Sequence, residues 1–307
     1  MTSIYWWQVT QLTATAVRDV QNEKPHFPIQ IDLVGVRGVK RKIKIQNSDQ
    51  TVFYDVEFNA FVDLPGNRRG VHMSRIIEAI LEVLDEKTEG NELKELLEQI
   101  CRKLLVKHPY SNRAEIEAKT TFYFDLDKEV KEAVNVSFDL HIKRDGGSEW
   151  NIGVEIEGMT VCPCAQAVFS SFEKTDQKFG LSHTQRTKLD IHVRSPGFAV
   201  PVEWLVEAAR MAFSAPVLSL LKRQREYELV KAAFKNPKFI EDTVRHAFSL
   251  IIKKLSKERI NLKTEVYVRG ESYESVHPFN AYASKKATLE QAINELSDIL
   301  TLPQLMG

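Results

Sequence analysis

Apolar side chains at every second position predict strands in the first half of the chain. The pattern is clearest around residue 55, where Val52 and Tyr54 face one side of the strand while Asp55 and Glu57 face the other. The strands predicted in this way cover residues 29–45, 51–63, 116–125 and 134–142. Helical spacing of apolar residues predicts two helices between them, over residues 74–86 and 93–104.

The second half of the chain shows a similar order of elements. Strands are predicted over residues 150–161, 188–194 and 262–269, with a short helix after the first of them. A helix is predicted over residues 201–221, with a kink at Pro216. Asn236 and Pro237 favour the start of another helix that runs to Leu255, and Thr288 with Gln291 forms a capping box for a final helix.

Two strands, two helices and two strands therefore follow one another twice. Short turns between paired strands favour antiparallel sheets, each with helices on one face, so we predict an α+β fold of two tandem ββααββ modules. The predicted division is an N-terminal leader at residues 1–28, a first module at 29–148 and a second module with the C-terminal helix at 149–307. Together the modules are expected to form one bimodular domain.

The composition argues against several classes of protein but does not by itself indicate a function. Lys plus Arg and Asp plus Glu each number 42 in the 307 residues, so the overall charge gives no sign of a nucleic-acid or membrane partner. Basic clusters at residues 37–44 and 222–225 are more typical of a solvated strand edge or helix end than of phosphate binding. The three cysteines are too few and odd in number for a disulfide scaffold, and we find neither a signal peptide nor a membrane-length apolar run. A cytoplasmic protein is the expectation.

The first candidate for chemistry is Cys162-Pro163-Cys164, which follows a predicted strand. The intervening proline limits closure of a disulfide between the two thiols. A single intervening residue is also too short a spacing for a structural zinc knuckle. From these residues alone, a structural or redox role is as well supported as a catalytic one. Cys101 is interpreted as a filler of a helix surface or core.

Three of the eight histidines lie in loop-like settings rich in polar residues: His72, His183 and His277. Glu274 is three residues before His277, so both can act on one centre. A thiolate, imidazoles and carboxylates suit a mononuclear metal site with room for water, and scattered surface histidines are an equal alternative. The other histidines carry no such signal: His141 and His192 on polar strand faces, expected to be solvated, and His26, His108 and His246.

The segments around these residues resemble the type IB GTP cyclohydrolase family and its archaeal branch. The resemblance rests on DVQ at 19–21, GVHMSR at 70–75, GMTVCPC at 158–164, SHTQR at 182–186, NPKF at 236–239 and YESVH at 273–277. Each segment is short, but together they follow the family's order across nearly the whole chain. The resemblance implies the tunnelling fold (T-fold), in a homodimer or homotetramer with its sites at subunit interfaces.

The resemblance also implies a set of site residues. Cys162, His183 and Glu226 are expected to bind a metal ion, and Glu274 and His277 to lie close to it as ligands or acid–base groups. Cys162, Glu274 and His277 are the expected catalytic residues. Glu241 is expected to grip the guanine edge, for which a carboxylate suits two neighbouring N–H donors. Arg75, Arg186 and Lys222 are candidates for the triphosphate, with ordinary surface bases as an equal alternative for each.

The implied reaction is hydrolysis of the imidazole ring of GTP with release of formate. Fe(2+), one per subunit, is the implied cofactor, with Mn or Zn as substitutes. After the thiols the bacterial branch has Ser-Lys-Glu, whereas this chain has Ala165-Gln166-Ala167, as in the archaeal branch. For that branch the resemblance implies 7,8-dihydroneopterin 2′,3′-cyclic phosphate plus diphosphate as products, and tetrahydromethanopterin synthesis as the pathway.

Three alternatives remain beside this hypothesis. A bacterial-type enzyme gives 7,8-dihydroneopterin triphosphate. A metal-free nitrile reductase of the same fold uses a cysteine nucleophile, although His183, Glu274 and His277 beside the thiol argue against it. A non-catalytic pterin- or purine-binding module needs Glu241 but not Cys162.

Overall fold

The computed structural model describes residues 18–47, 50–85, 92–127, 130–176 and 180–299. Most of the predicted N-terminal leader, residues 1–17, lies outside these ranges. The described part of the leader contains a short 3-10 helix, η1 (Val20–Asn22), which begins after Asp19. No helix in the described residues is long and apolar enough to cross a bilayer.

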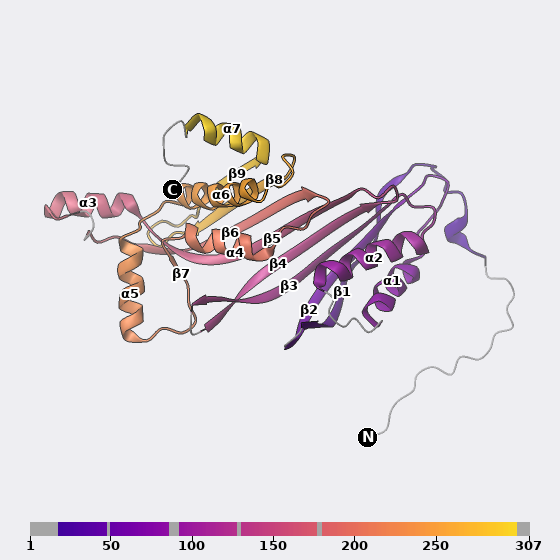
Figure 1. Ribbon diagram of the computed structural model, residues 1–307, viewed down its shortest axis with the longest axis horizontal. Helices are drawn as coiled ribbons and strands as arrows, with labels where there is room; N and C mark the ends of the chain where they lie inside the picture. Colours follow the sequence, from indigo (N-terminus) through magenta and orange to yellow (C-terminus); the bar gives the residue numbers. More distant parts are fainter. Residues whose placement is uncertain (1–17, 48–49, 86–91, 128–129, 177–179, 300–307) are drawn as a thin grey trace, which may run out of the picture.

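One antiparallel sheet runs through the described residues (Figure 1). Its order is β1-β2-β3-β4-β5-β6-β8-β9, with β7 paired to β5, so the two predicted sets of strands are joined into one sheet at β4 and β5. The strands are β1 (Ile31–Asn47), β2 (Gln50–Leu64), β3 (Arg113–Asp127), β4 (Val130–Lys143), β5 (Ser148–Val161), β6 (Thr184–Pro196), β7 (Ala215–Pro216), β8 (Glu265–Tyr273) and β9 (Ala281–Thr288). Whether the chain divides into two modules at residue 148 stays a prediction.

Helices lie over one face of this sheet, whereas others project from one end of the strands (Figure 1). The helices of the described residues are α1 (Met73–Asp85), α2 (Leu93–Lys107), α3 (Pro163–Glu173), α4 (Val202–Ala212), α5 (Arg223–Phe234), α6 (Ile240–Lys257) and α7 (Leu289–Ile299). Those that project are α3 and α5. The strand register shows why the face is shared. Phe58, Ala118, Phe138, Ile152 and Val193 lie opposite one another in a single row, and all of them are buried. Period-two alternation, kept in register across the sheet, produces one continuous apolar face.

Three predictions about single elements need correction. The helix predicted over 201–221 ends at Ala212, because the segment with Pro216 leaves it to pair with β5. Asn236 does not cap α6, which begins at Ile240, but donates to the carbonyl oxygens of Phe213 and Ser214 at 3.2 and 3.3 Å. The strand β9 was not predicted. The capping box of the last helix is confirmed by reciprocal hydrogen bonds of Thr288 and Gln291.

The two ends of the sheet carry different candidate residues. At one end β5 finishes at Val161, β6 begins at Thr184 and β8 finishes at Tyr273. We call this the Cys162 end. At the other end β2 finishes at Leu64, and the connection from there leads to Arg75 in the first turn of α1. We call it the Arg75 end.

Candidate functional site

Cys162 and His183 lie side by side at the Cys162 end. The pairing of β5 with β6 continues one residue beyond the strands, because the Cys162 N–H donates to the carbonyl oxygen of His183 at 3.2 Å. The Ser182 hydroxyl donates to the carbonyl oxygen of Cys162 at 2.6 Å and fixes the loop on the other side. The sequence motifs at 158–164 and 182–186 are therefore one structural unit.

Cys162 is also the N-cap of α3. Its sulfur accepts a hydrogen bond from the Ala165 N–H at 3.4 Å, and Pro163 occupies the first helical turn. A helix N-terminus presents partial positive charge, which suits a side chain that binds metals as a thiolate. Cys162 is half-buried, whereas Cys164 is exposed, so the two thiols of the pair have unequal environments.

The loop between β8 and β9 brings a second motif to the same place. Its Ser275 hydroxyl lies 3.3 Å from His183 Nδ1. The carboxylate of Glu274 is oriented by the buried Ser272 hydroxyl, which donates to its Oε1 at 2.8 Å. His277 is exposed and stacks on Phe279, with 5.3 Å between the ring centroids. The structure thus brings Glu274 into the neighbourhood of His183 and places His277 at the surface, against Phe279.

Glu241 lies in the first turn of α6, close to the end of β5. The connection is direct: the Lys238 N–H donates to the carbonyl oxygen of Val161, the residue before Cys162, at 3.0 Å. The Glu241 side chain is exposed, so its carboxylate is accessible to a ligand. The predicted base-recognition residue and the predicted thiolate ligand are therefore carried by adjoining segments.

Glu226 and Lys222 are less firmly placed. Both are exposed at the start of α5, a helix whose only buried residue is Ala233. Within the ranges that the structure describes, no group of three or more His, Cys, Asp or Glu side chains is close enough to hold a metal ion. One chain therefore offers Cys162 and His183 together, without Glu226 as a third ligand beside them.

The two predicted phosphate-binding arginines are separated. Arg186 lies on β6 opposite Tyr273 of β8, near the Cys162 end, where its guanidinium is 3.4 Å from Glu157. Arg75 lies at the Arg75 end, so the length of the strands separates it from Cys162. A single chain does not bring Arg75 to the predicted metal ligands.

Arg75 belongs to a polar cluster that sequence reasoning identified only in part. His72 Nε2 lies 3.1 Å from Asp19, and Arg68 stacks over the Tyr110 ring at 4.2 Å. Burial acts to raise the pKa of Asp19, but the hydrogen bond and charge of His72, together with backbone hydrogen bonds from Asn22 and Gln21, lower it. Burial raises the pKa of Tyr110 against the opposing charges of Arg68 and Arg75.

Two polar atoms of this cluster are buried without a hydrogen-bond partner in the described residues: His72 Nδ1 and the Tyr110 hydroxyl. Such atoms cost free energy unless a ligand, water or another chain satisfies them. The motifs at 19–21 and 70–75 were the sequence signal for this cluster, and Tyr110 carried none.

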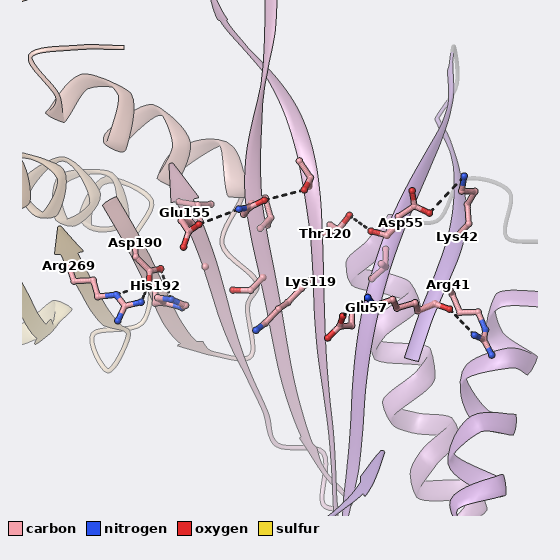
Figure 2. Close-up of a pocket in the computed structure, with 18 residues that line it drawn as sticks. Arg41, Lys42, Asp55, Glu57, Lys119, Thr120, Glu155, Asp190, His192 and Arg269 are labelled. Carbon is pink, nitrogen blue, oxygen red and sulfur yellow. Dashed lines mark hydrogen bonds and ion pairs between the residues drawn. The ribbon is translucent and has the colours of Figure 1, made fainter. Parts of the chain in front are cut away.

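The face of the sheet opposite the helices holds a wide groove of about 900 Å³, shown in Figure 2. Its charges are largely matched in pairs: Lys40 with Glu57 at 3.8 Å, Lys42 with Asp55 at 3.9 Å, and Arg269 with Asp190 at 2.5 Å. None of the predicted site residues is among the described residues that line it.

Two histidines on this face differ from the prediction that they are solvated. His192 Nε2 lies 2.9 Å from Asp190, and His141 Nε2 lies 3.5 Å from the buried Glu115. Burial acts to raise the pKa of Asp190, but the hydrogen bond and charge of His192, with Arg269, lower it. Both imidazoles are about 70% shielded from solvent (30% and 31% exposed), because the polar side chains of neighbouring strands crowd around them.

Comparison with known proteins gives a consistent result. The profile of the family described as "Type I GTP cyclohydrolase folE2" matches residues 17–283. A protein named GTP cyclohydrolase MptA from Aeropyrum pernix is 35% identical over 277 residues, covering 89% of this chain and 96% of the relative. A protein of the same name from Methanobrevibacter smithii is 35% identical over 310 residues, covering 92% of this chain and 99% of the relative.

Among solved structures, uricase from Arthrobacter globiformis superimposes with a TM-score of 0.50 at 10% sequence identity. The superposition covers 84% of this chain and 93% of the uricase chain. At that identity the likeness concerns the fold alone, a mixed α/β arrangement on an antiparallel sheet.

Proposed function

Because this chain belongs to the type I GTP cyclohydrolase folE2 family, an enzyme family, we propose that it hydrolyses the guanine imidazole ring of GTP with a bound metal ion. The proposed products are formate, 7,8-dihydroneopterin 2′,3′-cyclic phosphate and diphosphate, at the start of tetrahydromethanopterin-type pterin synthesis. The observation that carries the proposal is the meeting of Cys162, His183, Glu274 and the start of α6 at one end of the sheet. We also assign the chain to the tunnelling fold, as the uricase likeness supports.

The donor chemistry at the Cys162 end fits a borderline divalent ion. The backbone hydrogen bond places Cys162 next to His183, and a thiolate with an imidazole suits Fe(2+) or Zn(2+) far better than Mg(2+) or Ca(2+). We propose Cys162, His183 and Glu226 as the ligands, with one Fe(2+) per subunit and Mn or Zn as substitutes. When bound, such an ion lowers the pKa of a coordinated water and supplies hydroxide near neutral pH.

The proposed roles of the remaining groups follow from their positions. The Glu241 carboxylate accepts two N–H groups of the guanine and orients carbon 8 of the base toward Cys162 and His183. Glu274 and His277 move protons to the ring nitrogen and to the amine that is released as the ring opens. Carbon 8 then leaves as formate.

A second copy of the chain is part of the proposal. The helix that carries Glu226 buries one residue, so a single chain anchors this proposed ligand weakly. Arg75 and the two unpartnered buried atoms, His72 Nδ1 and the Tyr110 hydroxyl, lie at the other end of the sheet. We propose a homodimer or homotetramer in which the Arg75 end of one subunit meets the Cys162 end of the next and binds the triphosphate there. Arg186 and Lys222 are the proposed phosphate ligands from the subunit that holds the metal.

The cyclic phosphate is proposed over the triphosphate on account of α3. Where the bacterial branch has lysine, Gln166 is buried and donates to the Phe234 carbonyl oxygen at 2.9 Å, which ties α3 to the end of α5. The position therefore serves packing and supplies no positive charge to hold a triphosphate.

The test is an anaerobic assay of the protein loaded with iron(II). GTP should be converted with release of formate, and mass spectrometry should find the cyclic phosphate. Absence of formate would exclude cyclohydrolase activity and leave the nitrile reductase or a pterin- or purine-binding module. A triphosphate-bearing product would instead identify the bacterial-type reaction.

The Glu241→Gln variant sharpens the assay. Loss of a charged hydrogen-bond acceptor should lower kcat/KM about a hundredfold while metal content is unchanged. Glu258→Gln, at the exposed end of the same helix, is the matched control and should behave as the unmodified protein. Loss of the metal from Glu241→Gln would contradict its role in base recognition.

A further inference from the structure

We propose that Lys238 is a positioning residue that fixes Cys162 relative to Glu241. The proposal rests on the function above, since it assigns those two residues to the metal and to the guanine. Lys238 connects the two residues. Its backbone N–H is hydrogen-bonded to the end of β5, next to Cys162, and α6, which carries Glu241, begins two residues after it.

The side chain of Lys238 caps the end of α4. Its ammonium group donates to the carbonyl oxygens of Met211, Ala212 and Phe213 at 3.3, 2.8 and 3.2 Å. The last carbonyl groups of a helix have no partner within the helix and carry partial negative charge, so a cation there is stabilising. Lys238 thereby ties the start of α6 to the end of α4.

The segment after α4 is in turn hydrogen-bonded to the end of β5. The Ser214 N–H donates to the carbonyl oxygen of Met159 at 2.9 Å, and the Ser214 hydroxyl accepts from the Val161 N–H at 3.3 Å. Asn236 adds its two bonds to the carbonyl oxygens of Phe213 and Ser214. The end of β5, the segment after α4 and the start of α6 thus form a closed ring of hydrogen bonds, which we call the Lys238 clamp.

A fourth contact of the ammonium group is with His246 Nδ1, at 3.0 Å. Lysine has donors and no acceptor, so Nδ1 accepts, and the imidazole is neutral with its proton on Nε2. Burial, followed by the charges of Lys238 and Lys253, lowers the pKa of His246, which favours this neutral form. Burial also lowers the pKa of Lys238, against the charge of Asp242.

These contacts indicate that Lys238 positions other residues and takes no direct part in the reaction. The ammonium group lies within hydrogen-bond distance of four acceptors, three carbonyl oxygens and His246 Nδ1, which is enough to engage all three of its protons. Lys238 therefore acts on the reaction through the placement of Val161 and of the first turn of α6, rather than by contact with GTP.

The experiment compares two lysines that join the same pair of helices. Lys238→Met removes the clamp at the end of α4. Lys254→Met removes an exposed ion pair with Glu258 and the contact of Lys254 with the Trp204 ring, 4.5 Å away, where α6 meets the start of α4. Both variants are assayed well below their melting temperatures. Misplacement of reacting groups by about 1 Å costs on the order of a hundredfold in rate. Lys238→Met should therefore lose ten- to a hundredfold in kcat/KM with full metal content, and Lys254→Met should lose less than about twofold.

A measurement that does not need the reaction keeps the two proposals distinguishable. Amide hydrogen exchange should accelerate in Lys238→Met at residues 159–162, 213–216 and 238–241, and should be unchanged there in Lys254→Met. Asn236→Ala, a milder change in the same clamp, should show the same pattern at smaller size. Equal losses of kcat/KM in the two lysine variants, or unchanged exchange in Lys238→Met, would overturn the proposal. If the unmodified protein released no formate, the proposed function would fail, and the exchange pattern would still decide for or against the clamp.

Discussion

The Cys162 end and the Arg75 end of the sheet differ in how completely one chain builds them. At the Arg75 end, α2 buries seven residues and Asp63 accepts from the backbone N–H groups of Asn112 and Arg113, both at 2.8 Å. At the Cys162 end, α3 buries Gln166 and Ser170, and α5 buries Ala233 alone. The residues proposed for chemistry thus lie at the end that one chain leaves unfinished.

The difference indicates which parts of the site are preorganised. Cys162 and His183 are held by backbone pairing, which needs no partner, and the Lys238 clamp holds the start of α6. Glu226 and His277 have no comparable support in the described residues. Apolar side chains on α3 and α5, such as Phe172 and Tyr227, are exposed, and we propose that the second subunit packs on this surface.

The largest expected effect comes from breaking the Cys162 end. Cys162→Ala removes the proposed thiolate ligand, so bound iron should fall to background and formate release should drop by at least about a thousandfold. Elemental analysis and the formate assay measure both. Cys164→Ala is the matched control and should keep its metal, because Cys164 is exposed and lies beyond the N-cap. Iron retained at full occupancy in Cys162→Ala would show that the proposed ligand set is wrong.

A smaller effect is expected from the Arg75 end. Arg75→Glu places a negative charge where the triphosphate is proposed to bind, and should lower kcat/KM about a hundredfold without loss of metal. Arg102→Glu, on an exposed position of α2, is the control.

Mixing the two variants tests whether the ends meet. In a random dimer of Cys162→Ala and Arg75→Glu subunits, about a quarter of the sites contain neither change, so co-expression should restore about a quarter of the activity. Mixed oligomers that stay inactive would mean that the two ends do not share a site.

The smallest expected effect concerns the pH dependence of stability, to which each region contributes one histidine that is shielded from solvent: His108 is buried and His246 is half-buried. Burial lowers the pKa of His108 at the Arg75 end, against its hydrogen bonds to two carbonyl groups, and burial with the Lys238 and Lys253 charges lowers that of His246. Because the unfolded chain takes up protons first, their contribution to stability is complete above about pH 6.5 and is lost as the pH falls below it.

Denaturant titrations between pH 7.5 and pH 5 measure this contribution. A pKa lowered by one pH unit corresponds to about 1.4 kcal/mol in the free energy of unfolding. The variants His108→Gln and His246→Gln should each flatten the dependence in part. An unchanged slope in the double variant would assign the acid sensitivity to other groups.

Alternation and helical spacing predicted those elements whose faces are clearly divided between core and solvent. They failed for residues 201–221, where the segment around Pro216 has apolar neighbours that suit a helix equally well until its pairing with β5 is known. They also failed for β9, whose small and basic residues, Ala281 to Thr288, carry little apolar contrast. Pairing partners far away in the sequence decided both segments.

For the site residues, too, the sequence predicted local neighbours but not contacts between segments that are far apart in the sequence. The motifs around Cys162 and His183 predicted neighbours, and the structure pairs them. Arg75 and Arg186 were equal candidates for the triphosphate, although the two lie toward opposite ends of the sheet, because a local motif contains no information about strand direction. Asn236 satisfied the rule for a helix cap and serves the Lys238 clamp instead.

The order of strands in the sheet has a consequence for how the chain folds. Apart from the short β7, the described strands pair in the order in which they are synthesised, so most of the sheet can form by successive hairpins while the chain is still emerging. Two pairings close long connections: β2 with β3, across the segment from Leu64 to Arg113, and β6 with β8, across the longer segment from Pro196 to Glu265. The connection from Pro196 to Glu265 is the later one to be synthesised, and it carries Glu226, Lys238 and Glu241. Recognition of the base is therefore expected to be the last property that the chain acquires as it folds, and a kinetic intermediate with its first six strands formed would bind no nucleotide.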